Sequence, residues 1–280
     1  MQTDERMREV VIEGARLRYL EVGEGDPLVL LHGYPQNHHC WRHQITALAT
    51  ERRVIAPDLL GWGASDRNPA LRCDYDSEVA RIEMMFDEIG LGQVDLAAHD
   101  YGGFLGLGFL LRHPERVRRF AIMNSRAHQT FSATYYRHFA RLGIAGRRRV
   151  LRELLIRLPL GDLHRKSLAR YARKGCFDDA LLDEYVGWLD TRAGRRWFAH
   201  FCADYRVEIR PELAAGLPTI TAPTAVIWGD QDRPCPYSIA EDLAARIPHA
   251  TLTRIAGADH YVMEERPDVV TAALTEWLRP

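Results

Sequence analysis

Asp100 is the residue whose surroundings most clearly suggest chemistry. It lies in the segment AHDYGG, residues 98–103, which follows an apolar run and precedes a segment with helical patterning. A nucleophile held on a sharp strand-to-helix turn needs small flanking residues, and Ala98, Gly102 and Gly103 supply them. The reactive position in such a turn usually carries serine, whereas here it carries aspartate. The alternative is that Asp100 only caps the following helix, because aspartate favours the N-cap position.

Two further residues could act with Asp100. Asp232 follows a second apolar run in the segment GDQD, residues 229–232, and His260 follows a third in GADH, residues 257–260. A carboxylate that orients an imidazole, and an imidazole that activates water, are the other parts of a catalytic triad. The chain order is nucleophile, acid and histidine, and each residue comes just after a predicted strand. We therefore expect the three side chains to meet, although a lone Asp or His in a loop is ordinarily a surface residue.

Short apolar runs alternate with amphipathic segments along the first half of the chain and again near its end. The runs predict strands at 9–12, 17–22, 27–31, 53–56, 93–98, 117–123, 224–228 and 251–255, and the amphipathic segments predict helices at 41–49, 74–89, 102–112, 238–246 and 267–278. This alternation predicts an α/β fold with a mostly parallel, twisted sheet flanked by helices. Ligands of such sheets bind beyond the carboxyl ends of the strands, where the three candidate residues fall.

The stretch 125–219 interrupts the alternation. It is helical in pattern, and it contains 18 Arg or Lys against 10 Asp or Glu between Arg126 and Thr219. We therefore expect a core domain made of residues 1–124 and 220–280, and a helical cap, or lid, made of residues 125–219. Because the insert leaves the sheet at the carboxyl end of a strand, near Asn124, the cap should cover the site.

These motifs resemble the α/β-hydrolase superfamily over essentially the whole chain. The aspartate in HDYGG resembles that of one branch, the epoxide hydrolases, haloalkane dehalogenases and haloacetate dehalogenases. Three other segments are similar to this branch: HGYP at 32–35, DLLGWGASD at 58–66 and CADYR at 202–206. The resemblance implies an α/β-hydrolase fold with an inserted helical lid, and a hydrolase that attacks carbon through Asp100.

The chemistry of this branch implies two steps and needs neither a cofactor nor a metal. Asp100 would displace a leaving group and form an alkyl ester. His260, oriented by Asp232, would then activate water to hydrolyse that ester. The backbone N–H groups of Tyr34 and Tyr101 would form the oxyanion hole.

Residues of the lid would hold the leaving group. An opened epoxide is an alkoxide that needs a proton, and Tyr205 matches a lid tyrosine that supplies it in epoxide hydrolases. His138 or Tyr136 could be the second donor. Haloalkane dehalogenases usually have Trp after the nucleophile, to hold the halide, whereas this chain has Tyr101.

The substrate is expected to be a small neutral organic molecule, preferably an epoxide. Haloacetate dehalogenases carry two arginines that clamp the substrate carboxylate, and Tyr101 and Phe104 stand at those positions here. Arg126 could replace this clamp, although a surface position is the simpler expectation for it. The alternatives are a haloalkane or haloacetate dehalogenase with the same Asp-His-Asp triad, an ester or lactone hydrolase that uses Asp100 as a base, and a ligand-binding protein without turnover.

Composition indicates no partner beyond a small molecule and water. The 38 Asp and Glu residues nearly cancel the 37 Lys and Arg residues, so the whole chain gives no signal for nucleic acid or for a membrane. The five cysteines are odd in number and scattered, and residues 1–10 lack an apolar signal segment. These features predict a cytoplasmic protein with reduced thiols, and they are compatible with a homodimer.

Overall fold

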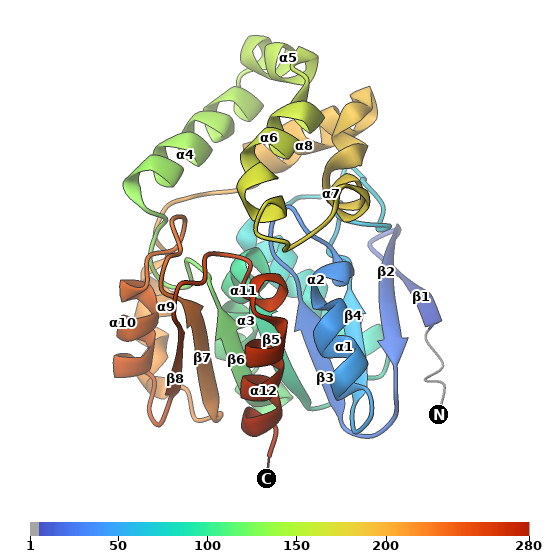
Figure 1. Cartoon of the computed structure of the whole chain (residues 1–280). Helices are drawn as coiled ribbons and strands as arrows, with labels where there is room; N and C mark the ends of the chain where they lie inside the picture. Colours follow the sequence, from blue (N-terminus) through green and yellow to red (C-terminus); the bar gives the residue numbers. More distant parts are fainter. Residues whose placement is uncertain (1–5, 280) are drawn as a thin grey trace.

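The computed structural model describes residues 6–279, and its sheet has the strand order β1-β2-β4-β3-β5-β6-β7-β8 (Figure 1). The strands are β1 (Arg6–Ile12), β2 (Ala15–Val22), β3 (Pro27–Leu31), β4 (Arg53–Pro57), β5 (Val94–His99), β6 (Val117–Met123), β7 (Thr224–Gly229) and β8 (Thr251–Ile255). β2 pairs antiparallel with β1 and with β4, and all other neighbours are parallel. The predicted α/β fold with a mostly parallel sheet is confirmed.

The central strands are buried throughout because helices cover both of their faces. Every residue of β5 and β7 is buried. Strands that are buried on both sides lose the alternation of polar and apolar residues. β2 lies near the edge of the sheet, and its burial alternates along most of its length.

Helices flank the sheet on both faces. They are α1 (Arg42–Leu48), α2 (Tyr75–Glu88), α3 (Asp100–Arg112), α10 (Ser238–Arg246), α11 (Val262–Glu265) and α12 (Pro267–Trp277), with the short 3-10 helices η1 (His38–Trp41) and η2 (Pro114–Arg116). α1 packs against α12 in front of the sheet in Figure 1, and α2 packs against α3 behind it. α2 buries Val79, Ile82 and Met85 on one face, as its helical period predicts.

Residues 125–219, which we call the cap, are helical where they have regular structure. The cap contains α4 (Ala133–Arg147), α5 (Arg149–Arg157), α6 (Leu160–Ala172), α7 (Asp179–Val186), η3 (Gly187–Asp190), α8 (Arg192–Asp204), α9 (Pro211–Gly216) and η4 (Leu217–Thr219). Helices α4 to α8 lie beyond the carboxyl ends of the strands (Figure 1), whereas α9 packs against α3. Within residues 6–279, no helix combines the length and the apolar character needed to cross a membrane.

Candidate active site

Asp100 occupies the sharp turn between β5 and α3. Its backbone is in the left-handed region, with φ of +47°, which few residues other than glycine adopt. The turn passes so close to the loop after β3 that a Cβ on Gly102 would lie 2.5 Å from the carbonyl oxygen of His32. Glycine is therefore required at 102, as expected, although α3 begins at Asp100 rather than at residue 102.

The carboxylate of Asp100 does not cap α3. His99 holds the N-cap position, and no side chain makes a capping hydrogen bond there. Instead, Oδ1 of Asp100 accepts a hydrogen bond from the backbone N–H of Tyr34, with a distance of 2.9 Å. The interpretation of Asp100 as an N-cap is therefore wrong.

The loop after β3 brings its backbone against Asp100. A Cβ on Gly33 would lie 2.5 Å from Cβ of Asp100, so only glycine allows Tyr34 to approach closely enough to donate. The N–H of Tyr101 lies in the first turn of α3, where backbone N–H groups have no partner within the helix. The N–H of Tyr34 thus contacts the carboxyl group of Asp100, and the N–H of the next residue, Tyr101, is not used within the helix.

His260 bridges two aspartates. Its Nε2 lies 3.4 Å from Oδ2 of Asp100, and its Nδ1 lies 2.8 Å from Oδ2 of Asp232. Asp232 also accepts hydrogen bonds from the side-chain amide of Asn124 at 2.7 Å and from the backbone N–H of Cys235 at 2.8 Å. The three residues singled out in the sequence therefore meet, and Asn124 is an additional residue that positions Asp232.

The charges of these groups support one another. Burial acts to raise the pKa of Asp100, but the hydrogen bond to His260 and its charge hold that pKa below its usual value. Burial acts to lower the pKa of His260, yet the carboxylates of Asp232 and Asp100 raise it to about 10. At neutral pH His260 is therefore an imidazolium between two carboxylates.

A cavity of about 340 Å³ lies between the sheet and the cap, and Asp100 and His260 line it. Most of its lining is aromatic or aliphatic, from the core (Tyr34, Pro35, Tyr101, Pro234, Tyr261) and from the cap (Phe131, Phe139, Leu142, Leu155, Leu160, Leu168, Phe198, Phe201). Such a surface suits an apolar molecule with its reactive centre at the carboxyl group.

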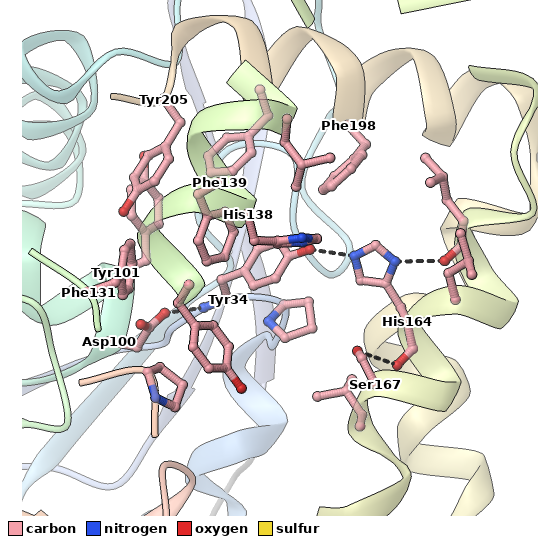
Figure 2. Close-up of a pocket in the computed structure, with 18 of the residues that line it drawn as sticks. Tyr34, Asp100, Tyr101, Phe131, His138, Phe139, His164, Ser167, Phe198 and Tyr205 are labelled. Atoms are coloured by element: carbon pink, nitrogen blue, oxygen red, sulfur yellow. Dashed lines mark hydrogen bonds between the residues drawn. The ribbon is translucent and has the colours of Figure 1, made fainter. Parts of the chain in front are cut away.

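Of the three cap residues predicted to hold the leaving group, two line the cavity and one does not. Tyr205 and His138 both line the cavity (Figure 2). Tyr136 does not, and its neighbour Tyr135 lines the cavity instead. Burial raises the pKa of Tyr205, so its hydroxyl stays protonated at neutral pH, whereas burial lowers the pKa of His138.

Arg126 does not line the cavity. Its guanidinium donates hydrogen bonds to the backbone carbonyls of Arg206, Val207 and Glu208, at 3.0–3.2 Å, and lies over the ring of Phe104. Only 2% of the residue is exposed, so the expectation of a surface arginine is wrong. Its position also leaves it unable to clamp a substrate, and it holds the loop that follows α8 instead.

His164 was missed by the sequence analysis. The hydroxyl of Tyr34 donates to Nε2 of His164, while Nδ1 donates to the carbonyl of Leu160 at 2.6 Å (Figure 2). Tyr34 thus contacts Asp100 through its backbone and α6 of the cap through its side chain. A histidine without a motif around it gives no sequence signal of such a role.

Asp259 joins the loop that carries His260 to the cap. Its Oδ1 accepts from the backbone N–H of His260 at 2.9 Å, from Arg170 at 3.2 Å and from the hydroxyl of Tyr171 at 3.3 Å. Lys174 of the cap pairs with Glu265 of the core at 2.8 Å. The end of α6 is therefore fastened to the segment that holds the histidine.

Among the described residues, Asp232, Cys235 and His260 are the only group of three or more that brings metal-ligating atoms close to one another. Asp232 and His260 already bind each other, and burial raises the pKa of the Cys235 thiol well above its usual value. This donor set fits the triad rather than a metal ion.

The fold, together with a buried acid–base pair at the carboxyl edge of the sheet beneath a cavity, defines an enzyme of the hydrolase type. The chain belongs to the alpha/beta hydrolase fold family, whose sequence profile matches residues 26–267.

Its relatives include three named enzymes. The chain is 31% identical to epoxide hydrolase A of Mycobacterium tuberculosis, over 97% of this chain and 96% of the relative. It is 29% identical to haloalkane dehalogenase 2 of the same species, over 93% of this chain and 91% of the relative. It is 26% identical to the cis-3-alkyl-4-alkyloxetan-2-one decarboxylase of Shewanella oneidensis, over 95% and 86%. The resemblance found in the sequence is thereby confirmed.

Proposed function

We propose that this protein hydrolyses epoxides through a covalent ester on Asp100. The observation that carries the proposal is the pairing of a carboxylate and a hydroxyl in one apolar cavity. Asp100 and His260 lie on its core side, and Tyr205 faces it from the cap (Figure 2). Opening an epoxide needs both groups, because one attacks carbon while the other protonates the departing oxygen.

In the first step, Oδ2 of Asp100 attacks a ring carbon of the epoxide. The other oxygen, Oδ1, is already held by the N–H of Tyr34, so the carboxylate is oriented before the substrate arrives. The ring C–O bond breaks, and the alkoxide takes the phenolic proton of Tyr205. His138 lines the same cavity and, being neutral, is suited to orient the oxygen rather than to protonate it.

The second step begins with a change of charge. Esterification removes the negative charge of Asp100, one of the two charges that raise the pKa of His260. That pKa therefore falls, and His260 gives up its proton, which restores the phenol of Tyr205 through solvent, so that the neutral imidazole becomes able to accept a proton from water. The resulting hydroxide adds to the ester carbonyl, whose oxygen is stabilised by the N–H groups of Tyr34 and Tyr101. Collapse of this intermediate releases the diol and restores the carboxylate.

Halide release is the second candidate function, because one relative is a haloalkane dehalogenase. A departing halide needs N–H donors rather than a proton. All six tryptophans lie within residues 6–279, and none of them lines the cavity. The indole of Trp188, for example, donates to the carbonyl of Tyr185. A strained lactone is a third candidate, since another relative acts on an oxetan-2-one. The absence of all six tryptophans from the lining favours an epoxide over a haloalkane.

A single turnover in heavy-oxygen water tests the mechanism. The ester pathway predicts that the new hydroxyl of the diol carries no heavy oxygen and that Asp100 becomes labelled, as mass spectrometry of its peptide would detect. Label that appears directly in the diol, with Asp100 unlabelled, would refute nucleophilic attack by Asp100. Running epoxide, haloalkane and oxetan-2-one panels in parallel identifies the substrate class, provided that diol, halide, and hydroxy acid or carbon dioxide are measured for the three panels respectively.

A further inference from the structure

The outer surface of the cap carries an unusual concentration of exposed apolar side chains. Eleven large hydrophobic residues are exposed in the described part of the chain, and six of them fall between residues 144 and 163: Ile144, Val150, Leu151, Leu154, Leu158 and Leu163. Val150 is 72% exposed and Leu154 is 51% exposed. Residues 150, 151 and 154 share one side of α5 at helical spacing and form an apolar stripe, and the exposed Leu158 follows directly after the helix.

The same segment is strongly basic. Six arginines lie between residues 141 and 157, against a single acidic residue, Glu153; they are Arg141, Arg147, Arg148, Arg149, Arg152 and Arg157. None of the six forms an ion pair with a carboxylate of the described chain, whereas arginines such as Arg81 and Arg165 do. The charge of this surface is therefore available to an outside partner.

The surface adjoins the mouth of the cavity. Of the residues that line the cavity, His138, Leu158, Leu163 and Ser167 are exposed, so the cavity opens where α4 faces the α5–α6 junction. α5 and this junction lie on the side of the cap farthest from the sheet (Figure 1). A molecule that leaves an adjoining apolar phase at this place would enter the cavity without crossing water.

We propose that residues 141–163 form a docking surface for an anionic phospholipid bilayer. A short helix with an apolar stripe and unpaired arginines is the pattern that lies in the plane of a membrane interface, with its apolar side among the acyl chains. Arginine near an anionic leaflet adds attraction that a neutral leaflet does not. The idea that a lipophilic epoxide enters the cavity from the bilayer rests on the proposed function, whereas the proposal that the surface docks on a bilayer does not. The near-neutral charge of the whole chain conceals this local surface.

Vesicle co-sedimentation of the full chain tests the proposal. We expect binding to vesicles that contain phosphatidylglycerol, weaker binding to pure phosphatidylcholine, and release by salt. The triple variant R148Q/R149Q/R152Q should bind the anionic vesicles about a hundredfold more weakly, because each arginine near the surface contributes about 1 kcal/mol. The variant V150S/L154S should lose binding without losing charge.

Matched controls separate docking from folding and from catalysis. The triple variant R72Q/R266Q/R279Q removes the same charge from exposed core positions, and it should bind like the unaltered chain. None of the substituted residues lines the cavity, so hydrolysis of a water-soluble epoxide should be unchanged in all variants. Failure of vesicle binding with activity intact would overturn docking alone, whereas binding without hydrolysis would overturn only the proposed function. Equal weakening by the control variant, or a dimer in solution that V150S/L154S dissociates, would also overturn the proposal, because the stripe would then face a second copy.

Discussion

The Asp232→Asn substitution removes the carboxylate that orients His260. Adding Asn124→Asp, which places a carboxylate at residue 124 instead, should recover part of the lost activity. The amide nitrogen of Asn124 lies 2.7 Å from Oδ2 of Asp232, and that oxygen lies 2.8 Å from Nδ1 of His260. If these two hydrogen bonds lay end to end, a carboxylate oxygen at position 124 would lie about 5.5 Å from Nδ1 of His260, which is the largest possible distance. At least half of the Coulomb interaction between the carboxylate and the imidazolium should therefore remain, because this energy is inversely proportional to distance. Asn124 already has a positive φ of 41°, which Asp also tolerates.

The expected magnitudes follow from this distance. Loss of the carboxylate that orients a catalytic histidine costs about 10⁴ in kcat, so Asp232→Asn should fall by that factor. Adding Asn124→Asp should reduce the loss in kcat from about 10⁴-fold to about 10²-fold, because half of the interaction energy corresponds to half of the logarithm of the rate ratio. Asn124→Asp alone should not help, since two adjacent buried carboxylates raise the pKa of one of them and destabilise the fold.

The assay is the rate of ester breakdown in a single turnover, because His260 acts in that step. Asp232→Asn with Asn124→Ala is the control that removes both groups. Thermal unfolding of each variant checks that the fold is retained. If the double variant folded but broke down the ester no faster than Asp232→Asn, the proposal that the buried carboxylate acts by orienting and charging the imidazole would be refuted.

Three further variants test separate parts of the site. Tyr205→Phe should slow ester formation from an epoxide by about 10², since it removes one donor to the developing alkoxide, and an unchanged burst of product would exclude that role. His260→Gln should slow ester hydrolysis by about 10² to 10⁴, and alkylated Asp100 should accumulate in mass spectra. The pKa of His260 is raised to about 10, so its protonation stabilises the fold fully below pH 6.5, and this stability is lost as the pH rises through 10; urea unfolding should show that decline in the unaltered chain but not in His260→Gln. Arg126→Met should lower the free energy of unfolding by about 3 kcal/mol, because one buried and two partly buried carbonyls lose their donor, and a change below the error of a urea titration would contradict this.

Much of the fold could be predicted because its strands and helices carry strong periodic signals. β3, β6 and β8 have their predicted bounds. For β3 the reason is a continuous apolar run bounded by turn residues, which is typical of a strand buried on both faces. The helix was predicted to start at residue 102, with Gly102 flanking the turn, whereas α3 starts at Asp100. The strain is instead concentrated at Asp100, and glycine is needed inside the helix for clearance from His32.

The details of the cap were beyond sequence reasoning for identifiable reasons. Successive residues of a helix point about 100° apart, so an alignment error of one residue exchanges Tyr135 for Tyr136. Arg126 binds backbone carbonyls some 80 positions away, and main-chain acceptors leave no trace in residue types. The contact of His164 with Tyr34 likewise joins distant segments through a single hydrogen bond.

Asp259 limits how freely the cap could be exchanged between enzymes of this architecture. Its carboxylate is shared between the backbone beside His260 and the cap residues Arg170 and Tyr171. A chimera that grafts a foreign cap onto this core would remove two donors from a buried carboxyl group next to His260. Such a graft would therefore have to supply its own partners for residue 259. We expect the cap and that loop to have been inherited together, although 88 residues separate Tyr171 from Asp259 in the chain.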